Sequence, residues 1–122
     1  MLIKSIVHVH ETITLNGGIT LNPFTFSTVD EGFAIQVQGL QASIYPYFAS
    51  TTTEIYQSIN RNIEHATDKG LLYGAWIDTN TWIVYQGLSA VRYDKKEAME
   101  LARKYKQKAI FDLKNKKEIF IK

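Results

Sequence analysis

Two histidines close to the N-terminus are the first residues whose type and spacing could support chemistry. His8 and His10 are two positions apart, so on a β-strand both side chains would lie on one face. Imidazole nitrogens bind zinc, but a third ligand would have to come from Glu11 or from His65, far along the chain. We therefore expect two histidines on the solvent-exposed face of a strand rather than a metal site.

Few other residues offer catalytic chemistry. Asp94 has the spacing of a helix cap and Asp78 that of a turn residue. Asp112 has no such local explanation, and its alternation with apolar neighbours predicts that it faces water. The chain contains no cysteine, no Gly-x-Ser-x-Gly motif, no phosphate-binding loop and no dinucleotide fingerprint. We expect no catalysis and no cofactor, since an enzyme would need a site assembled from distant residues.

Aromatic residues offer binding chemistry instead. The set comprises Tyr45, Tyr47, Phe48, Tyr73, Trp76, Trp82 and Tyr85. Trp76 and Trp82 are expected on opposite arms of a hairpin, near its tip. Trp76 with Tyr85 or Trp82 could flank a flat ligand, while Arg92 and a lysine-rich helix meet its phosphates. The alternative is that these rings form a packed core and a contact between subunits.

The composition is typical of one soluble globular domain. At 122 residues, with 45% hydrophobic and 21% charged residues, the chain suits a single domain over residues 1–122. The net charge is +2, and ten of the 14 basic residues lie between positions 95 and 122. Because a dedicated nucleic-acid binder usually has a larger basic excess, nucleic-acid binding is not the leading expectation.

The N-terminal segment gives no indication of targeting. Its first 11 residues alternate between apolar and polar types, which argues against a signal peptide and against a membrane span. The absence of cysteine fits a reducing compartment. We expect a protein that acts in the cytoplasm.

The first part of the chain is predicted to be extended. Residues 2–15 alternate in long pieces and are rich in β-branched side chains, which predicts one or two strands. Asn16-Gly17-Gly18 predicts a turn into a strand over residues 19–21. Residues 24–29 are interpreted as a further short strand or an extended loop.

Clean alternation resumes after a second turn. Residues 33–38 predict a strand whose buried face carries Phe33, Ile35 and Val37. Residues 41–48 are interpreted as a strand end or a loop that packs aromatic rings on the sheet.

Two helices are predicted, over residues 52–67 and 95–107. Thr51 and Glu54 have the spacing of a capping box at the start of the first. Its apolar residues recur at intervals of four, so they form a stripe that is expected to face the sheet. Asp94 is expected to cap the second helix.

The remaining segments complete an α+β domain. The predicted strands of the second half cover residues 71–78, 82–86, 88–93, 109–113 and 118–121. With the strands of the first half they give a mostly antiparallel sheet of about eight or nine short strands, combined with two helices.

A set of short segments runs through both halves. The C-terminal segments are Gly74-Ala75-Trp76, Tyr85, Asp94, Glu97-Ala98, Leu101-Ala102, Gln107 to Leu113 and Glu118-Ile119. The N-terminal segments are Gly18 to Leu21 and Gly32 to Val37. Together they resemble a pattern of small bacteriophage-encoded proteins of uncharacterised function. The resemblance implies a phage protein that acts in a bacterial cytoplasm, and it carries no catalytic residues over.

The expected function is binding without catalysis. The leading interpretation is a phage-type inhibitor of host antiviral defence that sequesters a nucleotide-like signal or covers a host protein. The alternative is a structural or interaction subunit that works as a homo-oligomer, and a nucleic-acid binder or small enzyme comes third. The candidate ligand-binding residues are Trp76, Trp82, Tyr85 and Arg92, with no metal site.

Overall fold

A computed structural model describes residues 2–47 and 50–121, and over residues 38–45 the backbone alone. Phe48 and the ring of Tyr45, both in the predicted aromatic set, lie outside the described part. In chain order the elements are α1 (Ile6–Asn16), β1 (Gly18–Asn22), β2 (Ser27–Thr28), β3 (Phe33–Pro46), α2 (Thr52–Lys69), β4 (Leu72–Asp78), β5 (Ile83–Arg92), α3 (Lys95–Lys104), β6 (Ala109–Asp112) and β7 (Lys117–Phe120).

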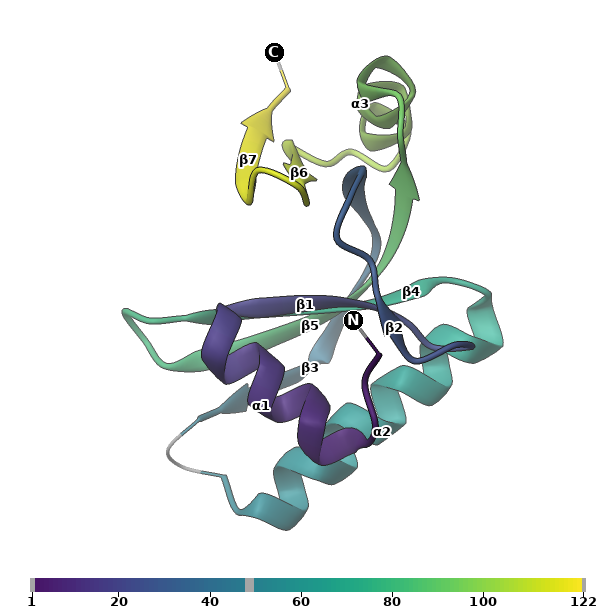
Figure 1. The fold of residues 1–122 in the computed structure, drawn as a ribbon. Coiled ribbons are helices and arrows are strands. Elements are labelled where there is room, and N and C mark those ends of the chain that lie inside the picture. The colour runs from purple at the N-terminus through teal and green to yellow at the C-terminus, as the bar shows by residue number, and fades with distance from the viewer. Residues whose placement is uncertain (1, 48–49, 122) are drawn as a thin grey trace.

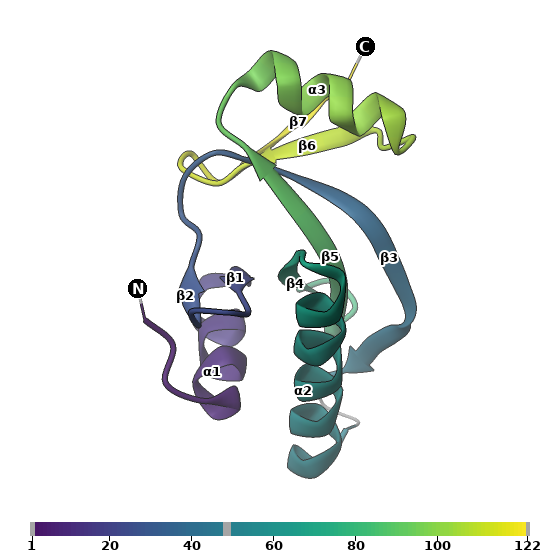
Figure 2. The ribbon, with the colours of Figure 1, turned by 90° about the vertical axis from the view of Figure 1, so that its right-hand side faces the viewer.

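The strands form one antiparallel sheet in the order β2-β1-β4-β5-β3-β6-β7. Figures 1 and 2 show α1 and α2 side by side on one face of β1, β4 and β5. Helix α3 and the β6–β7 hairpin lie at the far end of the long strands β3 and β5. The predicted α+β class with an antiparallel sheet is confirmed, whereas the expected numbers of strands and helices are wrong.

The N-terminal segment is a helix, which corrects the predicted strands over residues 2–15. The Ser5 hydroxyl caps α1 by accepting a hydrogen bond from the His8 backbone N–H at 3.3 Å. Gly17 closes the helix in the left-handed conformation, with φ of 82°. Val9 and Ile13 lie four positions apart on the buried face. Helical packing against α2 and β1 therefore outweighs the β-branched composition of the segment.

Helix α2 supplies most of the core on this side of the sheet. Thr51 and Glu54 form the predicted capping box, with reciprocal hydrogen bonds of 2.9 and 3.2 Å. The predicted stripe, Ile55, Ile59 and Ile63, is buried against the sheet. The helix continues two residues beyond the predicted end and stops at Gly70, which is left-handed.

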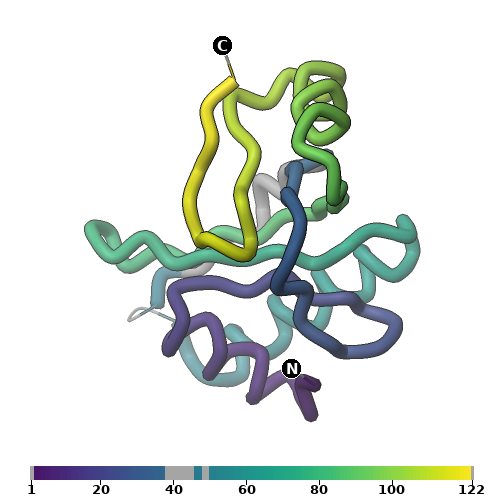
Figure 3. Tube along the Cα trace, turned by 45° about the horizontal axis from the view of Figure 1, so that its top comes forward, coloured from purple at the N-terminus to yellow at the C-terminus, as the bar shows by residue number. Residues whose placement is uncertain are grey.

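The two longest strands curl the sheet and link its two ends. The pairing of β3 with β5 shifts register between Gln36 and Gln38, and again between Gly39 and Ile44. On the N-terminal side of both irregularities, Ile35 packs into a second, smaller core with residues of α3 and β6. Figure 3 shows α3 and the β6–β7 hairpin standing on one side of β4 and β5, opposite α1 and α2. One face of the sheet is covered by α1 and α2. Because the sheet curls, its other face is open and concave.

Several predicted boundaries change because the strands are longer than expected. Residues 83–92 form one continuous strand, β5, instead of two separate strands. Strand β3 runs through the region that was interpreted as a strand end or loop. Helix α3 ends at Lys104, three residues before its predicted end. The predicted strands over residues 109–113 and 118–121 correspond to β6 and β7.

Three hairpins share one loop design. Asn22, Asp78 and Asp112 each end a strand, and four residues follow before the next strand begins. In each case the side-chain oxygen accepts a hydrogen bond from the backbone N–H two positions on, at 2.9, 2.8 and 3.1 Å respectively. The β4–β5 turn is therefore four residues long, and it includes Trp82, which was expected on the second arm of the hairpin.

Asp112 is buried rather than facing water, which corrects the prediction made for it. The residue is 7% exposed. Its carboxylate accepts hydrogen bonds from the Asn115 side chain at 2.8 Å and from the Asn115 and Lys114 backbone N–H groups. These bonds, led by that of the Asn115 side chain, hold the pKa of Asp112 below its usual value. Asp112 thus organises the β6–β7 turn.

No helix within residues 2–47 and 50–121 has both the length and the apolar character needed to cross a membrane.

Candidate binding groove

The open concave face of the sheet forms a groove of about 910 Å³. Its floor is made by β1, β4, β5 and β3, and the β6–β7 hairpin with the α3–β6 connection forms one wall. The opposite rim includes Asn16 and Gly17 at the end of α1. We call this space the concave groove.

Glycine residues line the floor of the concave groove, so no side chains of their own project into it there. Gly74 pairs with Gly87 across β4 and β5, and Gly18 on β1 pairs with Trp76, two positions along β4 from Gly74. A Cβ atom on Gly18 would come within 2.8 Å of the Ala75 backbone oxygen, so only glycine fits there without a shift. Alternation along the strands places Gln36 on the same face.

Polar side chains lie over two of these glycines. The Gln36 amide nitrogen would be 3.2 Å from a Cβ on Gly87, and the Ser89 hydroxyl 3.2 Å from a Cβ on Gly74. Both residues line the concave groove and are partly buried. They provide hydrogen-bonding groups at the floor of an otherwise smooth surface.

One rim of the concave groove carries Trp76, which the sequence singled out together with Tyr85. Trp76 and Tyr85 face each other across β4 and β5, and their rings stack with centroids 5.1 Å apart and an interplanar angle of 18°. Trp76 is 48% exposed and lines the groove. The two rings therefore do not leave a slot between them, and the outer face of Trp76 is the surface on which a flat group can stack.

The wall opposite Trp76 is basic and aromatic. Lys106 and Lys108 line it where the chain enters β6, and Lys116 lines it at the β6–β7 turn. Between them the exposed side chains of Phe111 and Phe120 lie on the groove face of the hairpin. Glu118 pairs with Phe111 and lies on the same face.

The other two predicted ligand-binding residues lie elsewhere. Trp82 is in the β4–β5 turn, with its ring 5.9 Å from that of Tyr47. Arg92 ends β5, pairs with Phe33, and donates a hydrogen bond from its guanidinium to the neighbouring Val91 carbonyl at 3.0 Å. Neither lines the concave groove. The structure thus brings together Trp76 and Tyr85 and separates both from Trp82 and Arg92.

Trp82 belongs to a second aromatic cluster, on the helix-covered side of the sheet. His10 stacks on Tyr47 with ring centroids 5.5 Å apart and meets Tyr56 edge-on at 6.1 Å. His8 lies on α1, where its Nδ1 accepts a hydrogen bond from the Lys4 backbone N–H at 3.2 Å. Because residues two apart on a helix point in different directions, His8 and His10 do not share a face as the strand prediction required. No three His, Asp or Glu side chains among the described residues gather to hold a metal ion.

Burial of His10 predicts a pH-dependent stability. Burial among aromatic rings lowers the pKa of His10 below its usual 6.5, and the nearby charge of Glu11 opposes this shift. The folded state therefore binds fewer protons than the unfolded chain in this range. The contribution to stability is fully present above pH 6.5 and is lost as the pH falls from there through the folded-state pKa.

We expect the free energy of unfolding to decrease between pH 7.5 and pH 5, and the replacement His10→Phe to remove part of that decrease. Urea unfolding followed by circular dichroism at both pH values measures the effect. His65→Gln, on α2, is the matched control and should leave the decrease unchanged. An identical pH dependence in the His10→Phe variant would contradict the prediction.

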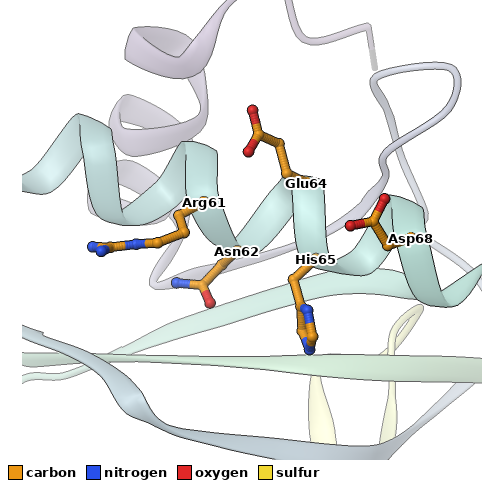
Figure 4. A pocket seen from close by; sticks show the side chains of 5 residues that line it. All are labelled: Arg61, Asn62, Glu64, His65 and Asp68. Atoms are coloured by element: carbon orange, nitrogen blue, oxygen red, sulfur yellow. The ribbon is translucent and has the colours of Figure 1, made fainter.

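A shallower hollow lies on the outer surface of α2. Figure 4 shows its side chains spreading from the helix in different directions rather than converging on one point. They are Arg61, Asn62, Glu64, His65 and Asp68. The Asn62 amide is bound to the Ser58 carbonyl at 2.8 Å. With no common focus, these side chains do not form a site.

The sequence did not reveal the groove residues outside β4 and β5. Lys106 lies in the predicted lysine-rich helix that was expected to meet the phosphates, whereas Lys108 and Lys116 were counted only among the basic residues of positions 95–122. The alternation over residues 33–38 put Gln36 on the face opposite Phe33, Ile35 and Val37. The alternation of β6 was an available indication, because burial of Ile110 places Phe111 on the opposite face. The β6–β7 hairpin lies across the groove from β1 and β4 because the sheet curls, and local sequence patterns do not encode this curl.

The resemblance to bacteriophage-encoded proteins stays a prediction. Comparison of the chain with protein-family models, with curated proteins and with solved structures finds no match, so its function has to be argued from the geometry of the concave groove.

Proposed function

We propose that this protein is a non-catalytic binding protein whose concave groove holds a flat, anionic ligand of the nucleotide class. The proposal is carried by one observation: an exposed indole, Trp76, and three lysines line the same groove of about 910 Å³. That volume lies toward the upper end of the range typical of small-molecule sites.

The chemistry of the lining matches the parts of a nucleotide. A heterocyclic base stacks favourably on an exposed tryptophan ring. Lysine ammonium groups attract phosphate, and Lys106, Lys108 and Lys116 supply three of them. Gln36 and Ser89 offer donors and acceptors to the edge of a base that lies on the glycine-rich floor.

Sequestration is the role that such a groove would serve in the setting that the phage resemblance implies. A binding protein without turnover lowers the free concentration of a host nucleotide signal by occupying it. The second route to inhibition is the covering of a host protein by the same concave face.

A homo-oligomer is the competing function, and exposed apolar side chains favour it. Leu15, Phe24, Tyr93 and Phe120 are 82%, 64%, 75% and 68% exposed. They belong to α1, to the β1–β2 loop, to the β5–α3 connection and to β7, and of the four only Phe120 lines the concave groove. We therefore prefer ligand binding as the primary role.

Tryptophan fluorescence tests the proposal directly. The variant Trp82→Phe leaves Trp76 as the sole tryptophan, so its emission reports only the concave groove. We expect a saturable change in emission on titration with AMP or ATP. Lys108→Gln in this background should weaken binding by about tenfold, because it removes one charge-assisted contact.

The reciprocal variant provides the control. Trp76→Phe retains only Trp82, which packs on Tyr47 outside the groove, and its emission should not respond. Absence of any response to nucleotides from Trp76 would refute the proposed function. A concentration-dependent change in mass, measured by light scattering without ligand, would support the oligomer instead.

A further inference from the structure

The charges along the β6–β7 wall of the concave groove alternate in sign. Lys106 and Lys108 lie at one end, Glu118 lies on the hairpin face, and Lys116 lies at the turn. Glu118 pairs with Phe111, in the second of the four pairs counted from the turn, so it lies between the two basic positions. Such a wall attracts anions at its two ends and repels them from its centre.

The two basic ends are well separated. Strand β6 has four residues, which sets Lys108 and the turn that holds Lys116 roughly 14 Å apart. The long lysine side chains could reach toward each other, but a single phosphate bound by both ends would lie close to the Glu118 carboxylate, which repels it. The arrangement therefore favours two anionic groups over one.

The middle of the wall is suited to uncharged, flat groups. Phe111 is 38% exposed and Phe120 68% exposed, and both rings lie on the groove face between the basic ends. Trp76 faces the same groove from the opposite rim. Aromatic surfaces on both sides allow more than one base to stack.

We propose that the ligand of the concave groove is a dinucleotide-type molecule with phosphate groups at both ends and its bases in between. This inference rests on the proposed function, because it names the class of nucleotide that the groove takes. One terminal phosphate binds at Lys106 and Lys108, and the other binds at Lys116. The bases lie against Phe111, Phe120 and Trp76.

A matched series of adenine ligands tests the inference. AMP has one phosphate, ApA has one internal phosphate, and pApAp adds a phosphate at each end of ApA. Titrations of the Trp82→Phe variant should show pApAp binding at least about tenfold more tightly than ApA or AMP. Lys116→Gln should reduce the affinity for pApAp toward that expected for one bound terminal phosphate, because Lys106 and Lys108 still hold the other, with little effect on ApA itself.

Lys114→Gln is the matched control for Lys116→Gln. It removes the same charge from the same turn, but Lys114 does not line the groove, so the preference for pApAp should persist. Urea unfolding of both variants verifies that each is folded.

The outcomes separate the two proposals. Equal binding of AMP, ApA and pApAp overturns the dinucleotide assignment and leaves the nucleotide-binding function standing. No binding of any of them overturns both. If Lys114→Gln also loses the preference for pApAp, net charge alone produces that preference. If the affinity keeps rising with longer oligoadenylates, the ligand is single-stranded nucleic acid. Either result overturns the assignment.

Discussion

Replacement of Gln86 by alanine is expected to lower the free energy of unfolding by about 3 kcal/mol. Gln86 is 3% exposed and links the sheet to α2. Its side-chain oxygen accepts from the Tyr73 hydroxyl at 2.7 Å, and its nitrogen donates to the Ser58 hydroxyl at 2.9 Å. The truncation leaves a cavity and removes hydrogen bonds from two buried hydroxyl groups, and these costs add.

Urea unfolding measures this loss, with Gln57→Ala as the matched control. Gln57 is exposed on the same helix that Gln86 contacts, so its truncation should change stability by less than about 0.5 kcal/mol. Tyr73→Phe removes one hydroxyl without a cavity of comparable size and should cost less than Gln86→Ala. A Gln86→Ala variant as stable as the original chain would show that the buried network contributes nothing.

Replacement of Ile35 by alanine is expected to cost about 3 kcal/mol and to loosen one end of the molecule selectively. Ile35 is fully buried in the smaller core, whose other buried members are Ala98, Ala102 and Ile110. Because Ala98 and Ala102 have small side chains, Ile35 and Ile110 supply most of the apolar area of these four residues, and truncation of Ile35 removes a large share of the packing under α3. The larger core, under α1 and α2, does not contain Ile35.

Amide hydrogen exchange resolved by segment measures the second part of this prediction. Exchange should accelerate in α3 and in the β6–β7 hairpin and stay unchanged in α2. Ile119→Ala, at a partly buried position of β7, is the control and should cost less than Ile35→Ala. Equal acceleration in α2 would mean that the two cores unfold as one unit.

Local sequence patterns predicted the elements whose ends carry their own chemistry. Thr51 and Glu54 make the expected capping box, and Asp94 accepts from the Lys96 and Glu97 backbone N–H groups as expected of a cap. The stripe at Ile55, Ile59 and Ile63 faces the sheet. In each case the pattern joins residues two to four positions apart, so it can be recognised within one short stretch of sequence.

The N-terminal helix was missed because intrinsic preference and tertiary packing disagree there. The β-branched residues of α1 favour strands, and the period of two and the helical period overlap in so short a segment. Ser5 and Gly17 were the indications of a helix start and end. Packing of Val9 and Ile13 against α2 decides the conformation, and α2 is about 40 residues away in the chain.

The residues of the candidate site likewise include some that local sequence patterns placed and others that depend on the tertiary structure. The sequence placed Trp76 and Tyr85 on the two arms of one local hairpin, whereas their direct pairing depends on the four-residue turn that the structure shows. Trp82 was expected on the second arm of this hairpin, but it is the last residue of the four-residue turn, has a φ of 54°, and lies beside Tyr47. Arg92 lies too far along β5 to reach the groove.

The sequence alone determined the α+β class, two of the helices and the β4–β5 and β6–β7 hairpins, because each follows from interactions between near neighbours in the chain. Only the tertiary structure decided that β3 lies between β5 and β6, and that the sheet curls to face Lys106, Lys108 and Lys116 toward Trp76. Strand order and curvature depend on contacts between distant segments and on register shifts in β3, and the energy of those contacts leaves no local pattern in the sequence.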